Sequence, residues 1–257
     1  MDATSIALLG AAGFVGGIIA SLAGGAAVVT FPTLLSVGLP PVAATATNQA
    51  ALMPGSIIAA LSDRSQLPPL DRGFVRLVLA SVIGAGGGAF LLTMTPTRVF
   101  EILVPLLLGF ATLLFAFGER ISIWIRKRSL ELHGHEPQIR LTSLPMLLPI
   151  SFYGGYFGAG LGVLLVAVLQ LATDGQYRPA NATKNLVSGL NGMVSVSVFA
   201  IQGAINWTAA LLMLGGVLVG ALIGARIARY APREAMRIVV TVIGALLTLA
   251  YAWRYWF

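Results

Sequence analysis

Long apolar runs, interrupted by glycine rather than by charge, constrain this chain more than any other feature. Six of them hold about 20 residues, the length with which one helix crosses the hydrocarbon core of a bilayer. Hydrophobic residues make up 57% of the sequence and charged residues 10%, whereas roughly a quarter of an ordinary soluble domain is charged. A soluble globular protein is therefore excluded, and the sequence predicts an all-α polytopic membrane protein. The six runs are Val42 to Leu61, Gly73 to Met94, Arg98 to Phe117, Ala180 to Gln202, Ala209 to Ile227 and Ala235 to Trp253.

Two further apolar runs, Ile6 to Ser36 and Leu144 to Ala172, do not fit this length. Each has roughly 30 residues, which is too long for one straight crossing of about 30 Å and too short for two. A glycine cluster lies near the middle of each run, at Gly24-Gly25 in the first and between Gly158 and Gly162 in the second. We interpret both runs as re-entrant hairpins of two short helices that break at the glycines.

The two halves of the sequence resemble each other. Gly16-Gly17 matches Gly154-Gly155 and Asn48 matches Asn185, and further glycines match at a nearly constant offset of about 137 residues. Such an offset indicates a duplication. We expect a first repeat at residues 1–118, a polar cytoplasmic linker at 119–142 and a second repeat at 143–257, each repeat being a glycine-broken hairpin followed by three transmembrane helices.

The basic residues of the loops orient the two repeats. If every long run is one crossing, these residues divide almost evenly between the two sides. If each hairpin enters and leaves on one side, only Arg98 and Arg254 lie outside, and the positive-inside rule favours this arrangement. Each half then has an odd number of full crossings, so the repeats are inverted, as in many secondary transporters that hold substrate near the midplane. The basic residues expected inside are Arg64, Arg72, Arg120, Arg126, Lys127, Arg128, Arg140, Arg178, Arg226, Arg229, Arg233 and Arg237.

Several motifs resemble the sulfite exporter TauE/SafE family. In the first repeat they run from Gly24 to Pro32 and from Gly38 to Asn48, and in the second from Phe152 to Gly160, from Asn181 to Asn185 and from Gly224 to Arg229. The resemblance covers the chain apart from residues 119–142. One departure is Ala26, which stands where the family usually has a third glycine. The resemblance implies a multi-pass transporter in the bacterial cytoplasmic (inner) membrane that exports small sulfur-containing anions such as sulfite or sulfonates.

An anion inside a bilayer needs fixed hydrogen-bond donors, because a buried unpaired charge costs several kcal/mol. The N-terminus of a helix supplies such donors, since its first N–H groups lack partners within the helix. Helices that begin near Ala26 and Val163 would aim their N-termini at the midplane. We therefore place Gly24, Gly25, Ala26, Gly160 and Gly162 in a candidate substrate-binding site; alternatively, these glycines only allow close helix packing.

Polar residues on the following helices complete the candidate site. Neutral hydrogen-bonding groups would come from both repeats, at Thr47, Asn48, Asn181 and Asn185. Alternatively, these side chains only form hydrogen bonds between helices. Lys184 lies deep inside a predicted span, and its repeat partner is the neutral Thr47. A cation there suits an anionic substrate and could exchange a proton, although a long lysine side chain can also extend back to the membrane surface.

Other functions find little support in the sequence. The chain has no cysteine and no pair of carboxylates inside a span, so we expect neither an enzyme nor a cofactor, and His133 and His135 alone do not make a metal site. The net charge of +7 comes from basic residues in the short loops between the apolar runs, so nucleic acid is not an expected partner. We predict a secondary transporter whose partners are a small anion and the lipid bilayer. The sequence is also compatible with a proton as coupling ion and with assembly into a homo-oligomer. The alternatives are an anion channel of the same fold and a non-transporting membrane scaffold.

Overall fold

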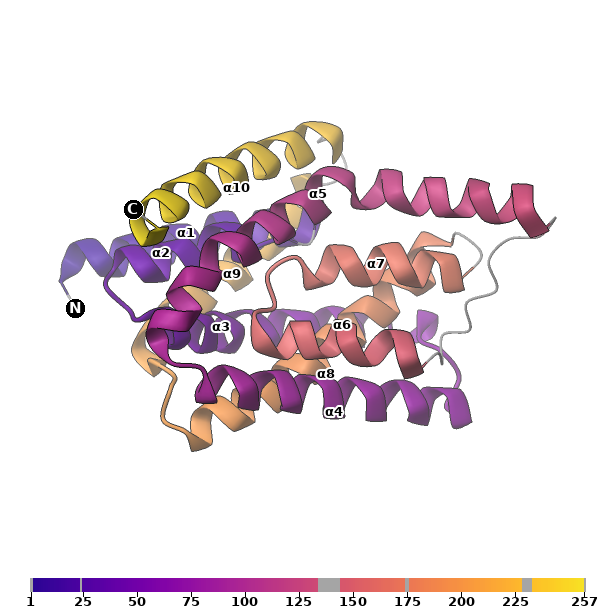
Figure 1. Ribbon diagram of the computed structural model, residues 1–257, viewed down its shortest axis with the longest axis horizontal. Coiled ribbons are helices and arrows are strands. Elements are labelled where there is room, and N and C mark those ends of the chain that lie inside the picture. The colour runs from indigo at the N-terminus through magenta and orange to yellow at the C-terminus, as the bar shows by residue number, and fades with distance from the viewer. Residues whose placement is uncertain (1, 24, 134–143, 174–175, 228–232, 257) are drawn as a thin grey trace.

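The computed structural model describes residues 2–23, 25–133, 144–173, 176–227 and 233–256, and the secondary structure of these residues is helical throughout. The prediction of an all-α protein is confirmed (Figure 1). The helices are α1 (Ala3–Ala23), α2 (Ala27–Ser36), α3 (Pro41–Ser62), α4 (Arg72–Met94), α5 (Thr97–His133), α6 (Leu144–Tyr156), α7 (Leu161–Ala172), α8 (Tyr177–Ile201), α9 (Trp207–Ile227) and α10 (Arg233–Trp256), with a short 3₁₀ helix at Arg64–Gln66.

Local sequence signals explain where several helices begin. Pro41 is the first residue of α3, a position where the missing N–H of proline costs no hydrogen bond. The Asp71 carboxylate accepts a hydrogen bond of 2.9 Å from the Phe74 N–H and caps α4. The predicted runs agree with α3, α4, α8, α9 and α10 to within a few residues. Helix α5 differs, because it continues to His133 and so includes the first part of the predicted linker, whereas His135 lies outside the described residues.

The two long apolar runs are both broken near their glycine clusters. In the second run, α6 and α7 have 13 and 12 residues and are the two short helices that we expected. In the first run α2 has only 10 residues, but α1 has 21, so the expectation of two short helices is wrong for α1. Within α1, Gly13 and Gly17 pack against the backbone of α9, and the helix ends next to Gly24, which lies outside the described residues.

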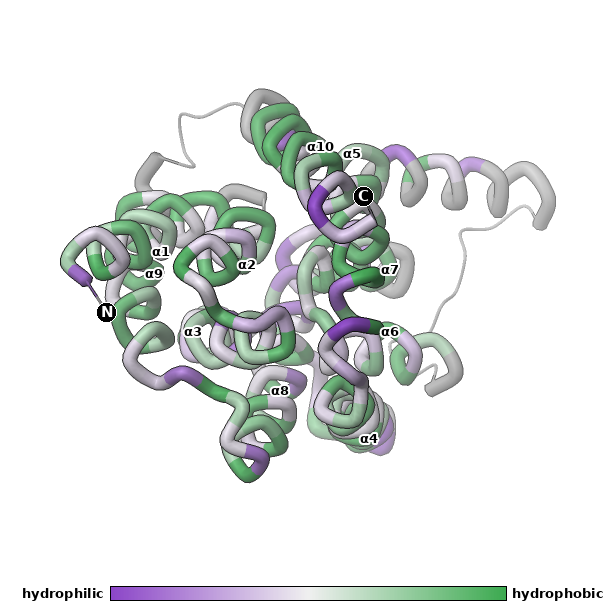
Figure 2. Tube along the Cα trace, turned by 60° about the vertical axis from the view of Figure 1, so that its left-hand side comes forward, coloured by the Kyte–Doolittle hydropathy of each residue, from purple (hydrophilic) through white to green (hydrophobic). Residues whose placement is uncertain are grey.

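Among the described residues, five helices are long and apolar enough to cross a membrane, namely α1, α4, α5, α9 and α10. Their outward faces carry large exposed apolar side chains, for example Ile83 on α4, Leu113 on α5 and Leu222 on α9. Figure 2 shows α1 and α9 on one side of α3, and α4, α5 and α10 on the other. Helices α3 and α8 are also predicted as spans and are long enough, but no stretch of either is as apolar as those of the five helices above, and the two pack against each other.

The packing pattern is nearly unchanged when the two halves of the chain are exchanged. Helix α1 packs along α9, and its counterpart α6 packs along α4, while α3 pairs with its counterpart α8 and α5 with α10. Each half therefore packs its broken hairpin against a helix of the other half. Both termini lie at one end of the bundle, where α1 begins and α2 ends, and the α6–α7 pair begins and ends at the opposite end (Figure 1).

Glycines make the two longest helix contacts possible. A Cβ atom on Gly220 of α9 would collide with the Phe14 carbonyl of α1, and one on Gly88 of α4 would collide with the Phe152 carbonyl of α6. Small residues let helix backbones approach closely inside a membrane. Close packing matters there because lipid is as apolar as the side chains, so burial of apolar surface stabilises a helix contact little. For these glycines, close packing is the physical explanation.

Candidate functional site

A cavity of about 610 Å³ lies between α3 and α8, next to the breaks between α1 and α2 and between α6 and α7. Two of its walls come from one face of α3 and one face of α8, because the residues that line it recur every three or four positions along each helix. The polar and charged residues at the cavity wall include Asn48, Gln49, Ser56, Asp63, Gln170, Asn181, Lys184, Asn185, Ser188, Asn191 and Arg237. Such a polar face accounts for the lower hydropathy of α3 and α8.

The two ends of the cavity differ in exposure. Asp63 and Tyr177, at the end where α3 finishes and α8 starts, are exposed, whereas Asn48 and Phe157 at the other end are buried. Beyond this deep end, the Phe157 ring packs edge-on against Phe31 of α2, with centroids 5.1 Å apart, and against Phe100 of α5 at 6.2 Å. The cavity is thus accessible from one end of the bundle and is closed by buried aromatic rings toward the end that carries the termini.

The α6–α7 break is held in a defined conformation at the cavity wall. Gly158 and Gly160 have φ angles of 78° and 80°, a left-handed conformation that other residues rarely adopt. The Gln49 side-chain amide donates hydrogen bonds of 3.2 Å to the carbonyls of both Gly154 and Gly155. In the described part of the chain, the N–H of Gly162, the second residue of α7, has no hydrogen-bond partner, and Gly162 lines the cavity. An unpaired N–H group at the positive end of α7 can bind an anion.

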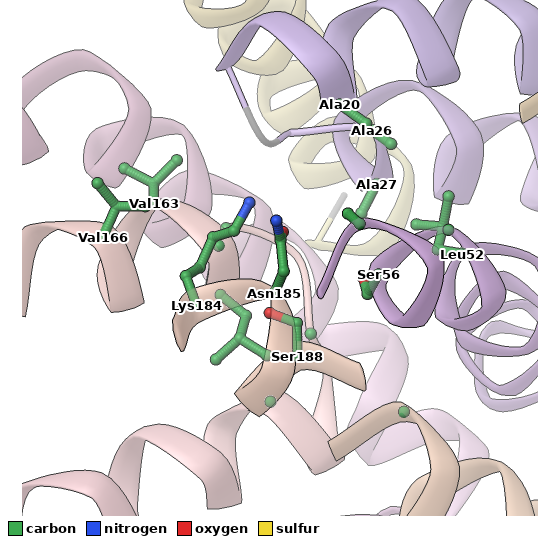
Figure 3. Close-up of a pocket in the computed structure, with 18 of the residues that line it drawn as sticks. Ala20, Ala26, Ala27, Leu52, Ser56, Val163, Val166, Lys184, Asn185 and Ser188 are labelled. Atoms are coloured by element: carbon green, nitrogen blue, oxygen red, sulfur yellow. The ribbon is translucent and has the colours of Figure 1, made fainter. Parts of the chain in front are cut away.

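Lys184 places a positive charge in the same cavity. Figure 3 shows the Lys184 and Asn185 side chains side by side, extending from α8 into the space between Val163 of α7 and Ala27 of α2. Among the described residues, none forms a hydrogen bond or an ion pair with the Lys184 ammonium group. Lys184 is seven residues from the start of α8, which places it about 10 Å along the helix.

The two asparagines at equivalent repeat positions both line the cavity. The Thr30 hydroxyl donates a hydrogen bond of 2.6 Å to Asn48 Oδ1. Among the described residues the Asn48 NH₂ group has no hydrogen-bond partner, so it can donate to a ligand. Asn185 forms no hydrogen bond with any described residue, so both groups of its amide stay available to a ligand.

The structure brings most of the predicted site residues together. Gly25 does not line the cavity, because the Phe115 ring packs against it. Thr47 also lies elsewhere: its hydroxyl accepts a hydrogen bond of 3.0 Å from the backbone N–H of Asn206 and fastens the loop before α9. Gly24 lies outside the described residues. The predicted residues at the cavity wall are Ala26, Asn48, Gly160, Gly162, Asn181, Lys184 and Asn185.

Several residues of the cavity wall were not predicted from the sequence. Ser188 and Asn191 follow Lys184 at helical spacing on the same face of α8, and Gln49 is adjacent to Asn48. A search for polar residues three, four or seven positions from Lys184 would have found the first two. No comparable signal points to Arg237, which is far away in the sequence and reaches the cavity wall from α10.

A bundle of apolar helices around a buried polar cavity with a cation at its wall defines a class, the membrane transporters of small solutes. The chain belongs to the sulfite exporter TauE/SafE family, whose model matches residues 9–251. It is 30% identical over 245 residues to "Probable membrane transporter protein ORF9" of Sinorhizobium sp, covering 95% of this chain and 91% of the relative. It is 25% identical to a "Probable membrane transporter protein" of Haemophilus influenzae, over 95% of this chain and 92% of that protein. No solved structure matches the chain.

Proposed function

We propose that this protein is a secondary transporter that exports a small sulfur-containing anion, such as sulfite or a sulfonate, across the bacterial cytoplasmic membrane. The observation that carries this proposal is the Lys184 ammonium group, which forms no hydrogen bond or ion pair with any described residue and lies in a cavity beside two helix breaks. A cation inside a membrane protein is costly unless a negative charge pairs with it. An anionic substrate is the partner that Lys184 lacks.

The other groups at the cavity wall suit an oxyanion. The Gly162 N–H and the amides of Asn48 and Asn185 offer hydrogen-bond donors that can replace water around the oxygens. These donors come from both halves of the chain, as expected for a substrate held between two repeats. Asp63 is acidic and exposed at the accessible end of the cavity, and its charge attracts the Lys184 ammonium group without forming an ion pair with it.

The arrangement of the hairpins supports inverted repeats and alternating access. The α1–α2 and α6–α7 pairs belong to opposite ends of the bundle, as two repeats related by inversion require (Figure 1). Access from one end only, with aromatic rings at the other, is typical of one state of a transporter. A continuous pore would instead favour the channel, and a scaffold would not need an unpaired cation.

Flux through purified protein in liposomes separates these three functions. We expect saturable uptake of ³⁵S-labelled sulfite that is accelerated by unlabelled sulfite on the opposite side. A transporter with bound substrate changes between its inward-facing and outward-facing states faster than an empty one does. A channel would give a conductive current without such acceleration, and a scaffold would give no flux. Repeating the measurement with an imposed pH gradient tests the proton as coupling ion.

Cysteine labelling tests the inverted arrangement in this cysteine-free chain. We expect Ser65→Cys and Gln176→Cys to react with an impermeant maleimide only from the cytoplasm, and Ser36→Cys and Gln202→Cys only from outside. All four positions are exposed, and the positive-inside rule assigns the sides. Labelling of Ser65→Cys and Gln202→Cys from the same side would contradict the inverted repeats.

A further inference from the structure

Gln49 is a polar residue deep inside α3 that has no polar counterpart in the second half of the chain. It lies eight residues from the start of the helix, which is about 12 Å along the helix axis. At the offset of about 137 residues the second half has Leu186, which packs among other apolar side chains. Asn48, by contrast, is matched by Asn185. A polar side chain at this depth without a counterpart needs a reason of its own.

The Gln49 amide covers the carbonyl end of α6. This helix ends at Tyr156, so the carbonyls of its last turn have no N–H partner in a following turn. In the described part of the chain, no backbone N–H bonds to the carbonyls of Gly154 or Gly155. Gln49 Nε2 donates a hydrogen bond of 3.2 Å to each of these two carbonyls. A side chain of α3 thus caps a helix that belongs to the other half of the chain.

The covered carbonyls lie next to the candidate anion site. Gly154, Gly158 and Gly162 all line the cavity, so the end of α6 and the start of α7 are both at its wall. The carbonyl end of a helix carries about half a negative charge, and the N–H end about half a positive one. Bare carbonyls at the end of α6 would repel the anion that the start of α7 attracts. In many secondary transporters, carbonyl ends of broken helices hold a coupling cation instead.

We infer that Gln49 sets the charge preference of the cavity, because its amide occupies the carbonyl end of α6 and leaves the N–H end of α7 to attract an anion. Gln49 also lies against the break itself, since a Cβ added to Gly158 would be 3.4 Å from Gln49 Nε2. It acts through α6 and the break, as a positioning residue that need not touch the ligand. This inference rests on the proposed function, because it assumes that an anion binds in the cavity.

Calorimetry on purified, folded protein tests the role of Gln49. Gln49→Met keeps the length of the side chain but has no N–H to donate. We expect it to weaken sulfite binding roughly 5- to 30-fold, the scale on which a helix-end charge acts in a partly buried site. Gln49→Lys regains a donor for the two carbonyls and should bind sulfite at least as tightly as the wild type. In alkaline buffer sulfite is a dianion, so its loss should exceed that of methanesulfonate, a monoanion of similar size.

Hydrogen exchange of residues 154–162 gives a second readout that needs no ligand. Loss of the cap should let the last turn of α6 open more often, so its amides should exchange faster in Gln49→Met and at the wild-type rate in Gln49→Lys. Gln202→Met makes the same change at an exposed position outside the cavity and should alter neither the exchange nor the affinities. Gln49→Leu, which places the residue of the second half in α3, serves if the methionine variant does not fold.

Two results would contradict the inference alone. Unchanged exchange in both Gln49→Met and Gln49→Leu would show that the amide does not cap α6. Faster exchange with unchanged affinities, or with an equal loss for sulfite and methanesulfonate, would show that Gln49 has a structural role only. A wild-type protein that binds neither anion would instead refute the proposed function and the charge preference with it, while the exchange would still decide whether Gln49 caps α6.

Discussion

Replacing Lys184 with alanine is expected to weaken anion binding by about 1 to 3 kcal/mol, which is roughly 5- to 150-fold in the dissociation constant. The ammonium group faces the cavity, and no described residue pairs with it, so the substitution removes an interaction with the ligand rather than one within the protein. Calorimetry with sulfite on purified, folded protein measures the change. Maximal flux in liposomes should fall as well if the lysine also pairs with the anion during transport.

Two further variants show whether charge at this position matters. Lys184→Arg should recover part of the affinity, because the charge remains although the planar guanidinium group fits a compact site less well. Arg178→Ala removes a positive charge from an exposed position of the same helix, outside the cavity, and should leave the affinity unchanged.

The opposite outcome has a clear physical meaning. A lysine that only extends to the membrane surface would contribute to insertion of α8 and not to binding. Lys184→Ala would then reduce the amount of inserted protein a little, and the purified variant would bind sulfite like the wild type. That result would remove Lys184 from the binding site.

Replacing Gly220 with leucine is expected to disrupt the fold, at a cost of about 3 kcal/mol or more. A Cβ atom at this position collides with the backbone carbonyl of Phe14, and a backbone atom cannot move aside as a side chain can. Helices α1 and α9 must then separate along one of the two longest contacts in the protein. The melting temperature in detergent, followed by size-exclusion chromatography, should drop strongly.

Gly215 provides the matched control on the same helix. A Cβ atom there meets nothing within 4 Å and the residue is exposed, so Gly215→Leu adds the same side chain to α9 without a collision. We expect the melting temperature of this variant to stay close to that of the wild type. Similar destabilisation by both substitutions would show that helix propensity or hydropathy of α9, rather than its contact with α1, decides stability.

Much of the secondary structure could be predicted from the sequence because a bilayer permits few solutions. A run of about 20 apolar residues has to form a helix, since its backbone groups find no water in the hydrocarbon core. For this reason the ends of α3, α4 and α9 agree with the predicted runs to within a few residues. The breaks at Gly25 and Gly160 were also recognisable, because glycine clusters interrupt both long runs. The length of α1 was not, because a break at Gly24-Gly25 does not by itself show that the helix before it is long enough to cross a membrane.

The candidate site was predictable only in part. Lys184, Asn48 and Asn185 could be identified as polar residues inside apolar runs, which need a reason to be there. Thr47 has the same kind of signal, yet its hydroxyl is bound to the backbone of Asn206, 159 positions away in the sequence. The unpaired amide of Asn191 could not be recognised, because only its packing against Gly154 shows that no group in the described part of the chain forms a hydrogen bond with it.

The sequence by itself determined the helical membrane class, the duplication and the polar residues available to a site, because hydrophobic run length and glycine spacing are local properties of the chain. Only the tertiary structure decided which of these residues face one cavity, which end of that cavity is accessible, and which glycines serve packing. These properties depend on contacts between helices that are distant in the sequence, such as α1 with α9 and α3 with α8. Close packing in a membrane is set by the detailed fit of helix surfaces, and a single sequence does not state which surfaces meet.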